Sequence, residues 1–151
     1  MGRIYNMAFS GAASAAALDL LEIAAPSTDI VVVHEIGISQ LLDFGDAEEE
    51  MLLLQWKRGV TTGTASAGVE TPLLVGDAAA ATVTKYNSTV ASTGGTVMYS
   101  WYWNIRIPFQ MIWTPETRPI LAPSEVGALF QATTPTDTIT YGGYIVFEEI
   151  G

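Results

Sequence analysis

The sequence contains no cysteine. This absence excludes a disulfide framework, a thiolate nucleophile and a thiolate metal site. Histidine occurs only once, as His34, in a segment rich in isoleucine and valine. Catalytic triads and histidine metal sites need further polar partners, and the adjacent Glu35 is expected on the opposite face of a strand. We therefore interpret His34 as a hydrogen-bonded core or interface residue, and we expect no enzymatic activity and no catalytic residues.

Basic residues are also scarce. Sixteen acidic residues face six basic ones, which gives a formal net charge of -10. Such a surface repels the phosphates of nucleic acids and the head groups of anionic lipids. No apolar run reaches the roughly eighteen residues that a membrane-spanning helix needs. The sequence therefore predicts neither a nucleic-acid partner nor a membrane partner.

The densest acidic cluster lies at residues 43–50, which include Asp43, Asp46 and three consecutive glutamates. Carboxylates in a loop can bind Ca²⁺, but the spacing of an EF-hand and its terminal glutamate are missing. Runs of surface charge are more often solvated than bound to an ion. We predict no metal site and no cofactor, and ion binding by this acidic cluster is the alternative.

The most informative segment is 97–113, because three of the four tryptophans lie in it. The odd-numbered positions from Val97 to Phe109 are all apolar, and they alternate with a set that is mostly polar or amphipathic. Alternation with a period of two places the two sets on opposite faces of a strand. We predict that this aromatic segment is the central strand of a β core.

Other segments carry a similar signal. Residues 30–40 and 138–150 are rich in β-branched and aromatic side chains, which favour strands. Segment 17–25 fits either a helix or a bulged strand, and we favour the strand. Turn residues separate about seven or eight strands, which is typical of a sandwich or a jelly roll. We predict an all-β protein, a jelly-roll-like antiparallel β-sandwich in which residues 1–151 form a single domain.

Residues 59–95 are the least regular part of the sequence, since threonine, glycine, alanine and serine dominate them. We predict a long irregular loop region there, of the kind that is usually functional or interfacial in a compact domain. The period-two pattern of the other segments predicts which side chains face inward. The predicted core residues are Trp101, Trp103, Ile105, Val32, Ile36, Leu53 and Ile145.

The polar side of the aromatic segment is the best candidate for contact with a partner, because tyrosine and arginine are enriched among interface anchors. Trp113 lies beyond a proline and is expected to be the most exposed tryptophan. The only adjacent pair of basic residues is suited to acidic groups on a partner. The predicted interface residues are Tyr102, Asn104, Arg106, Trp113, Lys57 and Arg58.

Four parts of the sequence together resemble a known family. They are the opening MGRIYNMAF, the block LDLLEIAAPSTDIVVVHEIGISQ, the tripeptide KRG at 57–59 and the ending GGYIVFEEIG. In order, and over most of the chain, they are similar to head decoration (cement) proteins of tailed bacteriophages. The resemblance implies a non-enzymatic virion protein that binds and stabilises the outside of a capsid. Its implied partners are the major capsid protein and the chain itself, as a homo-oligomer for which a trimer is expected.

A carbohydrate-binding sandwich, such as a lectin or adhesin module, is the alternative function. The rings of Trp101, Trp103 and Trp113 could stack on sugars, although the alternation assigns the first two to the core. The exposure of Trp113 and Tyr102 separates the two hypotheses. Exposed rings beside polar groups favour sugar binding, whereas burial at a contact between chains favours assembly.

Overall fold

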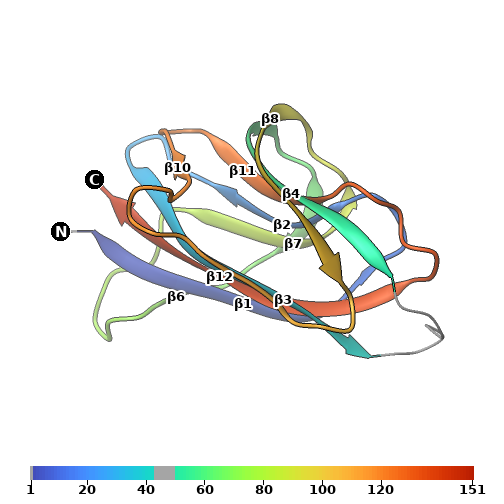
Figure 1. Ribbon diagram of the computed structural model, residues 1–151. Helices are drawn as coiled ribbons and strands as arrows, with labels where there is room; N and C mark the ends of the chain where they lie inside the picture. Colours follow the sequence, from blue (N-terminus) through green and yellow to red (C-terminus); the bar gives the residue numbers. More distant parts are fainter. Residues whose placement is uncertain (1, 43–49) are drawn as a thin grey trace.

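The computed structural model describes residues 2–42 and 50–151 (Figure 1). Within these residues it contains twelve β-strands and no helix, which confirms the predicted all-β class. The strands are β1 (Arg3–Ser14), β2 (Asp19–Ala24), β3 (Ile30–Leu42), β4 (Met51–Thr61), β5 (Thr64–Ala67), β6 (Glu70–Pro72), β7 (Val83–Val90), β8 (Thr93–Asn104), β9 (Phe109–Ile112), β10 (Ile120–Leu121), β11 (Val126–Gln131) and β12 (Ile139–Ile150).

The strands form two antiparallel sheets that pack face to face, so the predicted antiparallel sandwich is confirmed (Figure 1). The first sheet has the order β10-β3-β12-β1-β6, and β9 pairs with another part of β3. The second sheet has the order β5-β7-β2-β11-β4-β8. The longest pairings, β3 with β12, β1 with β12 and β4 with β8, join segments that are far apart in the sequence.

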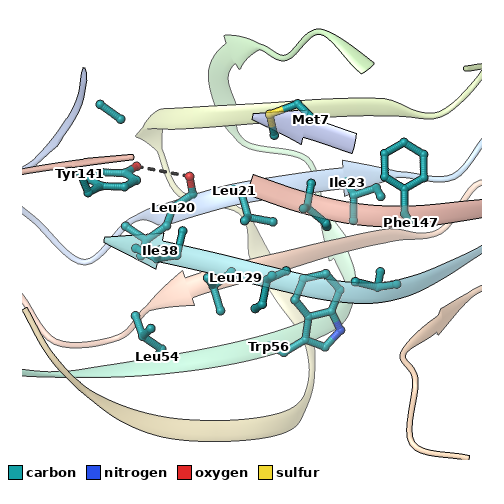
Figure 2. Packing of buried hydrophobic residues seen from close by; sticks show 14 of the residues in the cluster. Met7, Leu20, Leu21, Ile23, Ile38, Leu54, Trp56, Leu129, Tyr141 and Phe147 are labelled. Carbon is teal, nitrogen blue, oxygen red and sulfur yellow. Dashed lines mark hydrogen bonds between the residues drawn. The ribbon is translucent and has the colours of Figure 1, made fainter. Parts of the chain in front are cut away.

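One hydrophobic core fills the space between the sheets (Figure 2). Its strands are rich in β-branched and aromatic residues, which pack well on a pleated surface. In the first sheet, the rings of Tyr5 and Phe147 stack with their centroids 5.5 Å apart. The hydroxyl of Tyr141 donates a hydrogen bond across the core to the carbonyl of Leu20, at 3.3 Å. The core includes four of the residues predicted to lie there, which are Trp103, Ile105, Ile36 and Ile145.

A β-bulge at His34 changes which face of β3 points inward. In the pairing with β12, Val146 lies opposite Glu35 but Phe147 lies opposite Val33, so His34 is the extra residue. An extra residue shifts the alternation of side chains by one position. Val32 is therefore buried, as expected, but it lies outside the main core cluster.

Leu53 is a wrong prediction of the core set. The consecutive leucines of β4 alternate in burial, and Leu52 and Leu54 point into the core. Leu53 is only partly buried and pairs with Tyr102, which is 71% exposed, so both lie on the outer face of the second sheet. The residues that follow show the same phase, since Leu53 alternates with Gln55 and Lys57 whereas Leu52 and Leu54 alternate with Trp56.

The aromatic segment 97–113 is not the single central strand that was predicted. Its first part belongs to β8, an edge strand of the second sheet, and its last part forms β9, which pairs with β3 in the first sheet. Strand β8 pairs with β4 on one side and is the last strand of the second sheet. Its inner face holds Trp103 in the core, whereas Trp101 is only partly buried against the core. Tyr99 and Trp101 pack against the core from this edge, and their ring centroids lie 5.9 and 6.2 Å from that of Trp113.

Residues 59–95 are more regular than expected, and this region explains why the strand number exceeds the predicted seven or eight. It contains β5, β6 and β7, and β8 begins at Thr93. These strands are rich in threonine, serine and alanine, so they lack the apolar alternation that marks a strand in a sequence. Strand β2, in contrast, confirms the strand interpretation of segment 17–25.

Candidate interaction surfaces

The outer face of the first sheet carries an unusual set of exposed aliphatic side chains. Cross-strand pairs place them together: Ile120 lies opposite Val32, and Ile30 lies opposite Ile150. Five isoleucines on this surface are between 36% and 64% exposed. We call this surface the isoleucine face, and its members are Ile4, Ile30, Ile112, Ile120 and Ile150.

The acidic residues on the isoleucine face have partners within the chain. His34 Nε2 lies 3.1 Å from Glu148 Oε2, so the only histidine is hydrogen-bonded, and its partner is not the adjacent Glu35. Glu35 accepts hydrogen bonds from the hydroxyl of Tyr144 and from Gln110 Nε2. Burial, and then the hydrogen bond to Glu35, raise the pKa of Tyr144. With its carboxylates engaged in this way, the face presents mainly aliphatic groups to solvent.

A shallow groove of about 250 Å³ lies beside the Tyr144 ring. Its lining includes Ser39, Pro108 and Gln110. A Cβ atom at Gly37 would collide with the Tyr144 ring, so glycine is needed for the ring to lie flat on the sheet. An aromatic ring next to hydroxyl and amide groups can bind a polar, flat-faced ligand such as a sugar.

The predicted residues on β8 lie close together, near the end of that strand. Tyr102 is exposed on the outer face, and the backbone N–H of Arg106 donates to Asn104 Oδ1 at 3.0 Å in the turn that follows. This hydrogen bond satisfies one backbone group of the turn. Tyr102 and Arg106 are both exposed, and their part in an interface stays a prediction.

The predicted basic pair lies on β4, and both side chains have contacts within the chain. Lys57 Nζ lies 3.8 Å from the centroid of the Phe130 ring, a cation–π contact. Arg58 Nε lies 3.9 Å from Glu125 Oε1. That distance is long for an ion pair and the arginine is exposed, so the contact leaves Arg58 free to meet another carboxylate.

Trp113 is buried, which corrects the expectation that it is the most exposed tryptophan. Its side chain is only 4% exposed and makes edge-to-face contacts with Trp56 and Trp101, at centroid distances of 6.0 and 6.2 Å. The backbone N–H of Trp113 donates to the His34 carbonyl at 3.1 Å, which holds the segment after β9 against β3. A tryptophan platform for sugars is therefore not formed by Trp103 and Trp113, which belong to the core.

Two buried carboxylates on β2 have roles that the sequence analysis missed. Asp19 accepts hydrogen bonds from the backbone N–H and the hydroxyl of Ser92, at 2.5 and 2.9 Å. Glu22 accepts from the Thr62 hydroxyl at 2.8 Å and from the Gly63 backbone N–H at 3.0 Å. These bonds fix the two connections that run between β4 and β5 and between β7 and β8. The signal in the sequence was two acids spaced three apart in an otherwise apolar strand.

A second missed feature is the apolar turn that follows β6. Leu73, Leu74 and Val75 are all well exposed, and Val75 is 97% exposed. A turn of this kind is marked in the sequence by glycine and aspartate after an aliphatic run. In the sequence, this aliphatic run falls within residues 59–95, for which a long irregular loop region was predicted.

No family model of known proteins matches the chain, and no curated protein or solved structure matches it either. Among the described residues, there is no helix of the length and apolarity needed to cross a membrane. The same residues contain no group of three or more metal-ligating side chains. The acidic cluster at 43–50 lies, except for Glu50, outside the described residues.

Adding EDTA should leave the melting temperature unchanged. A metal that binds only the folded state stabilises it by linkage, so removing a structural metal would lower the melting temperature. Thermal unfolding followed by circular dichroism, with and without the chelator, measures this. A fall of many degrees would contradict the prediction and would make the acidic cluster at 43–50 a candidate Ca²⁺ site, which replacement of its carboxylates would test.

Proposed function

We propose that the chain is a non-enzymatic structural protein of a bacteriophage virion, which binds and stabilises the outside of the capsid. Its partners are the major capsid protein and further copies of the chain, in a homo-oligomer for which we expect a trimer. The observation that carries this proposal is the isoleucine face. Within the described residues, this aliphatic surface contains no cluster of catalytic side chains, and binding to the capsid would cover it.

The energetics of the isoleucine face favour a large partner over a small ligand. Contiguous exposed apolar surface marks interfaces with proteins, because covering it removes apolar area from water. The face is broad and follows the sheet, whereas small-ligand sites are concave. The pairing of His34 with Glu148 and the hydrogen bonds of Glu35 lower the cost of desolvating the acids on the same face.

The order of the strands also supports the proposal. When β5, β6 and β7 are set aside, the first sheet reads β1-β12-β3 with β9 and β10, and the second reads β2-β11-β4-β8. Along this reduced order the chain crosses between the sheets at every step but two. The exceptions are β4 to β8, which are neighbours in the second sheet, and β9 to β10, which both pair with β3 in the first sheet. This alternation is what a jelly roll of two four-stranded sheets requires, and that architecture is common in viral capsid proteins and lectins.

The resemblance of four sequence segments to phage decoration proteins supplies the capsid as the partner. Two of these segments, the opening and the ending, form β1 and β12, which are adjacent in the first sheet. The block that contains IVVVHEIGISQ forms β3 on the other side of β12. Three of the five members of the isoleucine face, Ile4, Ile30 and Ile150, therefore come from segments that carry the resemblance.

Co-sedimentation with undecorated capsids of the encoding phage tests this function. We expect the wild-type chain to pellet with the capsids, and Ile112→Asp to lose at least about tenfold in affinity, since burying an unpaired charge costs more than about 1.4 kcal/mol. Val83→Asp is the matched control, because Val83 is exposed to a similar degree on β7 in the second sheet. Equal binding by both variants, or no binding by the wild type, would contradict the proposal.

The groove beside Tyr144 favours carbohydrate binding as the second candidate function. The ring lies next to Gln110, whose Nε2 donates to the Tyr144 hydroxyl at 2.8 Å, and Ser39 adds a hydroxyl group. Binding of the chain to a glycan array, measured beside its co-sedimentation with capsids, distinguishes the two functions. Binding that is lost in Tyr144→Ala, in a chain that stays in the supernatant with capsids, would support the lectin-like function instead.

A further inference from the structure

We propose that copies of this chain associate head to tail, with the apolar turn Leu74–Val75 of one copy seated in the pocket beside Ile120 of the next. This inference rests on the proposed function to the extent that both involve a homo-oligomer, and it names the contact that forms it. The two surfaces lie on opposite edges of the first sheet, at β6 and at β10. Two different surfaces on opposite edges are what a head-to-tail contact requires.

The turn extends from the β6 edge of the first sheet (Figure 1), and its aliphatic side chains are exposed. Leu74 is 66% exposed and Val75 is almost fully exposed. Gly76 has a φ of 101°, which L-residues rarely adopt, and it closes the turn together with a hydrogen bond from the Asp77 N–H to the Leu74 carbonyl at 3.2 Å. Aliphatic residues at the tip of a tight turn gain nothing from water and are suited to a partner's pocket.

The turn is held in place at both ends. The Leu73 backbone N–H donates to the Ile4 carbonyl at 2.9 Å, and the Tyr5 hydroxyl donates to the Ala78 carbonyl at 3.1 Å. Further along, the Thr82 backbone N–H donates to Glu149 Oε1 at 2.6 Å. A tip fixed in this way loses little conformational entropy on binding, which favours association.

The pocket lies at the β10 edge of the same sheet and has a volume of about 330 Å³. Its walls are mainly aliphatic, and its size suits one or two branched side chains rather than an extended peptide. Two members of the isoleucine face contribute to it. The pocket is lined by Ile30, Ile120, Ala122, Pro123, Arg58 and Glu125.

The charges around the two surfaces are complementary. Asp77 follows the apolar tip, and Arg58 lies on the rim of the pocket. The other rim charge, Glu125, is already engaged, since its Oε2 accepts from the Ala122 backbone N–H at 2.8 Å and its Oε1 lies 3.9 Å from Arg58 Nε. The carboxylate of Asp77 from the next copy can therefore accept hydrogen bonds from the exposed guanidinium of Arg58. Such a pair fixes the register of the contact more than it adds to its strength.

The contact has a consequence for the isoleucine face. The turn is hydrogen-bonded to Ile4, and the pocket contains Ile30 and Ile120. Ile4 and Ile120 lie in the same row across the strands, so the two surfaces are at opposite edges of the first sheet but at the same height along its strands. Seating the turn in the pocket brings the β6 edge of one copy beside the β10 edge of the next. Ile4, Ile112 and Ile150 do not line the pocket, so these members of the isoleucine face stay available to the capsid in the assembly. A head-to-tail contact of this kind closes into a ring when the rotation between successive copies closes.

The mass of the purified chain in solution tests the contact without any capsid. We expect the wild type to form a closed oligomer, and Val75→Asp and Ile120→Asp each to lower its mass to that of a monomer. Mixing the two variants should restore a dimer, because one intact turn then meets one intact pocket. Val83→Asp is the control and should keep the wild-type mass. A self-complementary contact, in which the same surface meets itself, would give no dimer on mixing and would overturn the proposal.

Cysteine trapping provides a second measurement, since the natural chain has no cysteine. Chains with Val75→Cys are mixed with chains carrying Ile120→Cys and oxidised, and we expect a mixed disulfide dimer that exceeds the self-linked dimers. Melting curves of all variants exclude loss of folding as the cause of a lower mass. A monomeric wild type that gives no mixed disulfide contradicts this contact, even if the chain still pellets with capsids. Failure to pellet by a chain that forms the ring contradicts the capsid function alone.

Discussion

Replacing Trp103 with alanine should lower the free energy of unfolding by about 3–5 kcal/mol, the usual cost of removing a buried tryptophan. The Trp103 side chain is only 2% exposed and lies in the core cluster. Its indole N–H donates to the Ile107 carbonyl at 2.8 Å, so the substitution also removes the partner of a backbone group. Urea unfolding followed by circular dichroism measures the change.

Tyr102→Ala is the matched control for this substitution. Tyr102 is the adjacent residue on the same strand, but its side chain points outward and is largely exposed. We expect a change within about 0.5 kcal/mol, as for most surface substitutions. A loss of less than about 1 kcal/mol in Trp103→Ala, or an equal loss in both variants, would show that the inner face of β8 is not packed against the core.

Replacing Asp19 with alanine should cost about 1–3 kcal/mol, because it leaves the buried backbone N–H of Ser92 without its acceptor. Asp19 is 1% exposed and Ser92 is 8% exposed, so water cannot replace the lost hydrogen bonds without local opening. Asp19→Asn keeps an oxygen acceptor for the Ser92 N–H and should cost much less at neutral pH. Urea unfolding of the two variants separates the hydrogen bonds from the charge.

The same carboxylate predicts a dependence of stability on pH. Burial raises the pKa of Asp19 above its ordinary value of 3.8, although the hydrogen bonds from Ser92 act in the opposite direction. A raised pKa in the folded state means that the contribution of Asp19 to stability is fully present below the ordinary pKa and is lost as the pH rises through the raised pKa. The stability of Asp19→Asn relative to the wild type should therefore increase with pH across this range. A relative stability that falls as the pH rises would contradict the prediction.

The sequence by itself determined the fold class and much of the core. β-Branched and aromatic residues at a period of two identified β3, β8 and β12, and the alternation correctly placed Trp103 and Ile105 inside. Periodicity is informative here because each of these strands has one face in the core and one in solvent, so buried and exposed residues alternate along the sequence. The same reasoning found Tyr102 and Arg106 on the exposed side.

Only the tertiary structure decided the positions that depend on pairing. The bulge at His34 moved Val32 out of the core cluster, and Leu53 lies on the outer face beside Tyr102. The phase of Leu53 could have been read from Gln55, Trp56 and Lys57 in the same strand. The bulge, in contrast, leaves no trace in local periodicity, because it is set by the pairing with a strand that is distant in the sequence. For the same reason, the sequence did not show that β8 is an edge strand or that Trp113 folds back onto Trp56.

The candidate surfaces were the part least accessible from the sequence. The isoleucines of the outer face come from β1, β3, β9, β10 and β12, and in the sequence each reads as an ordinary strand residue. The folding of five separate segments into one sheet is what gathers them, just as it brings the apolar turn and its proposed pocket to opposite edges. Composition and local pattern are properties of neighbouring residues, so they fixed the class of this protein. Its surfaces join residues that meet only in space, and they were therefore decided by the tertiary structure.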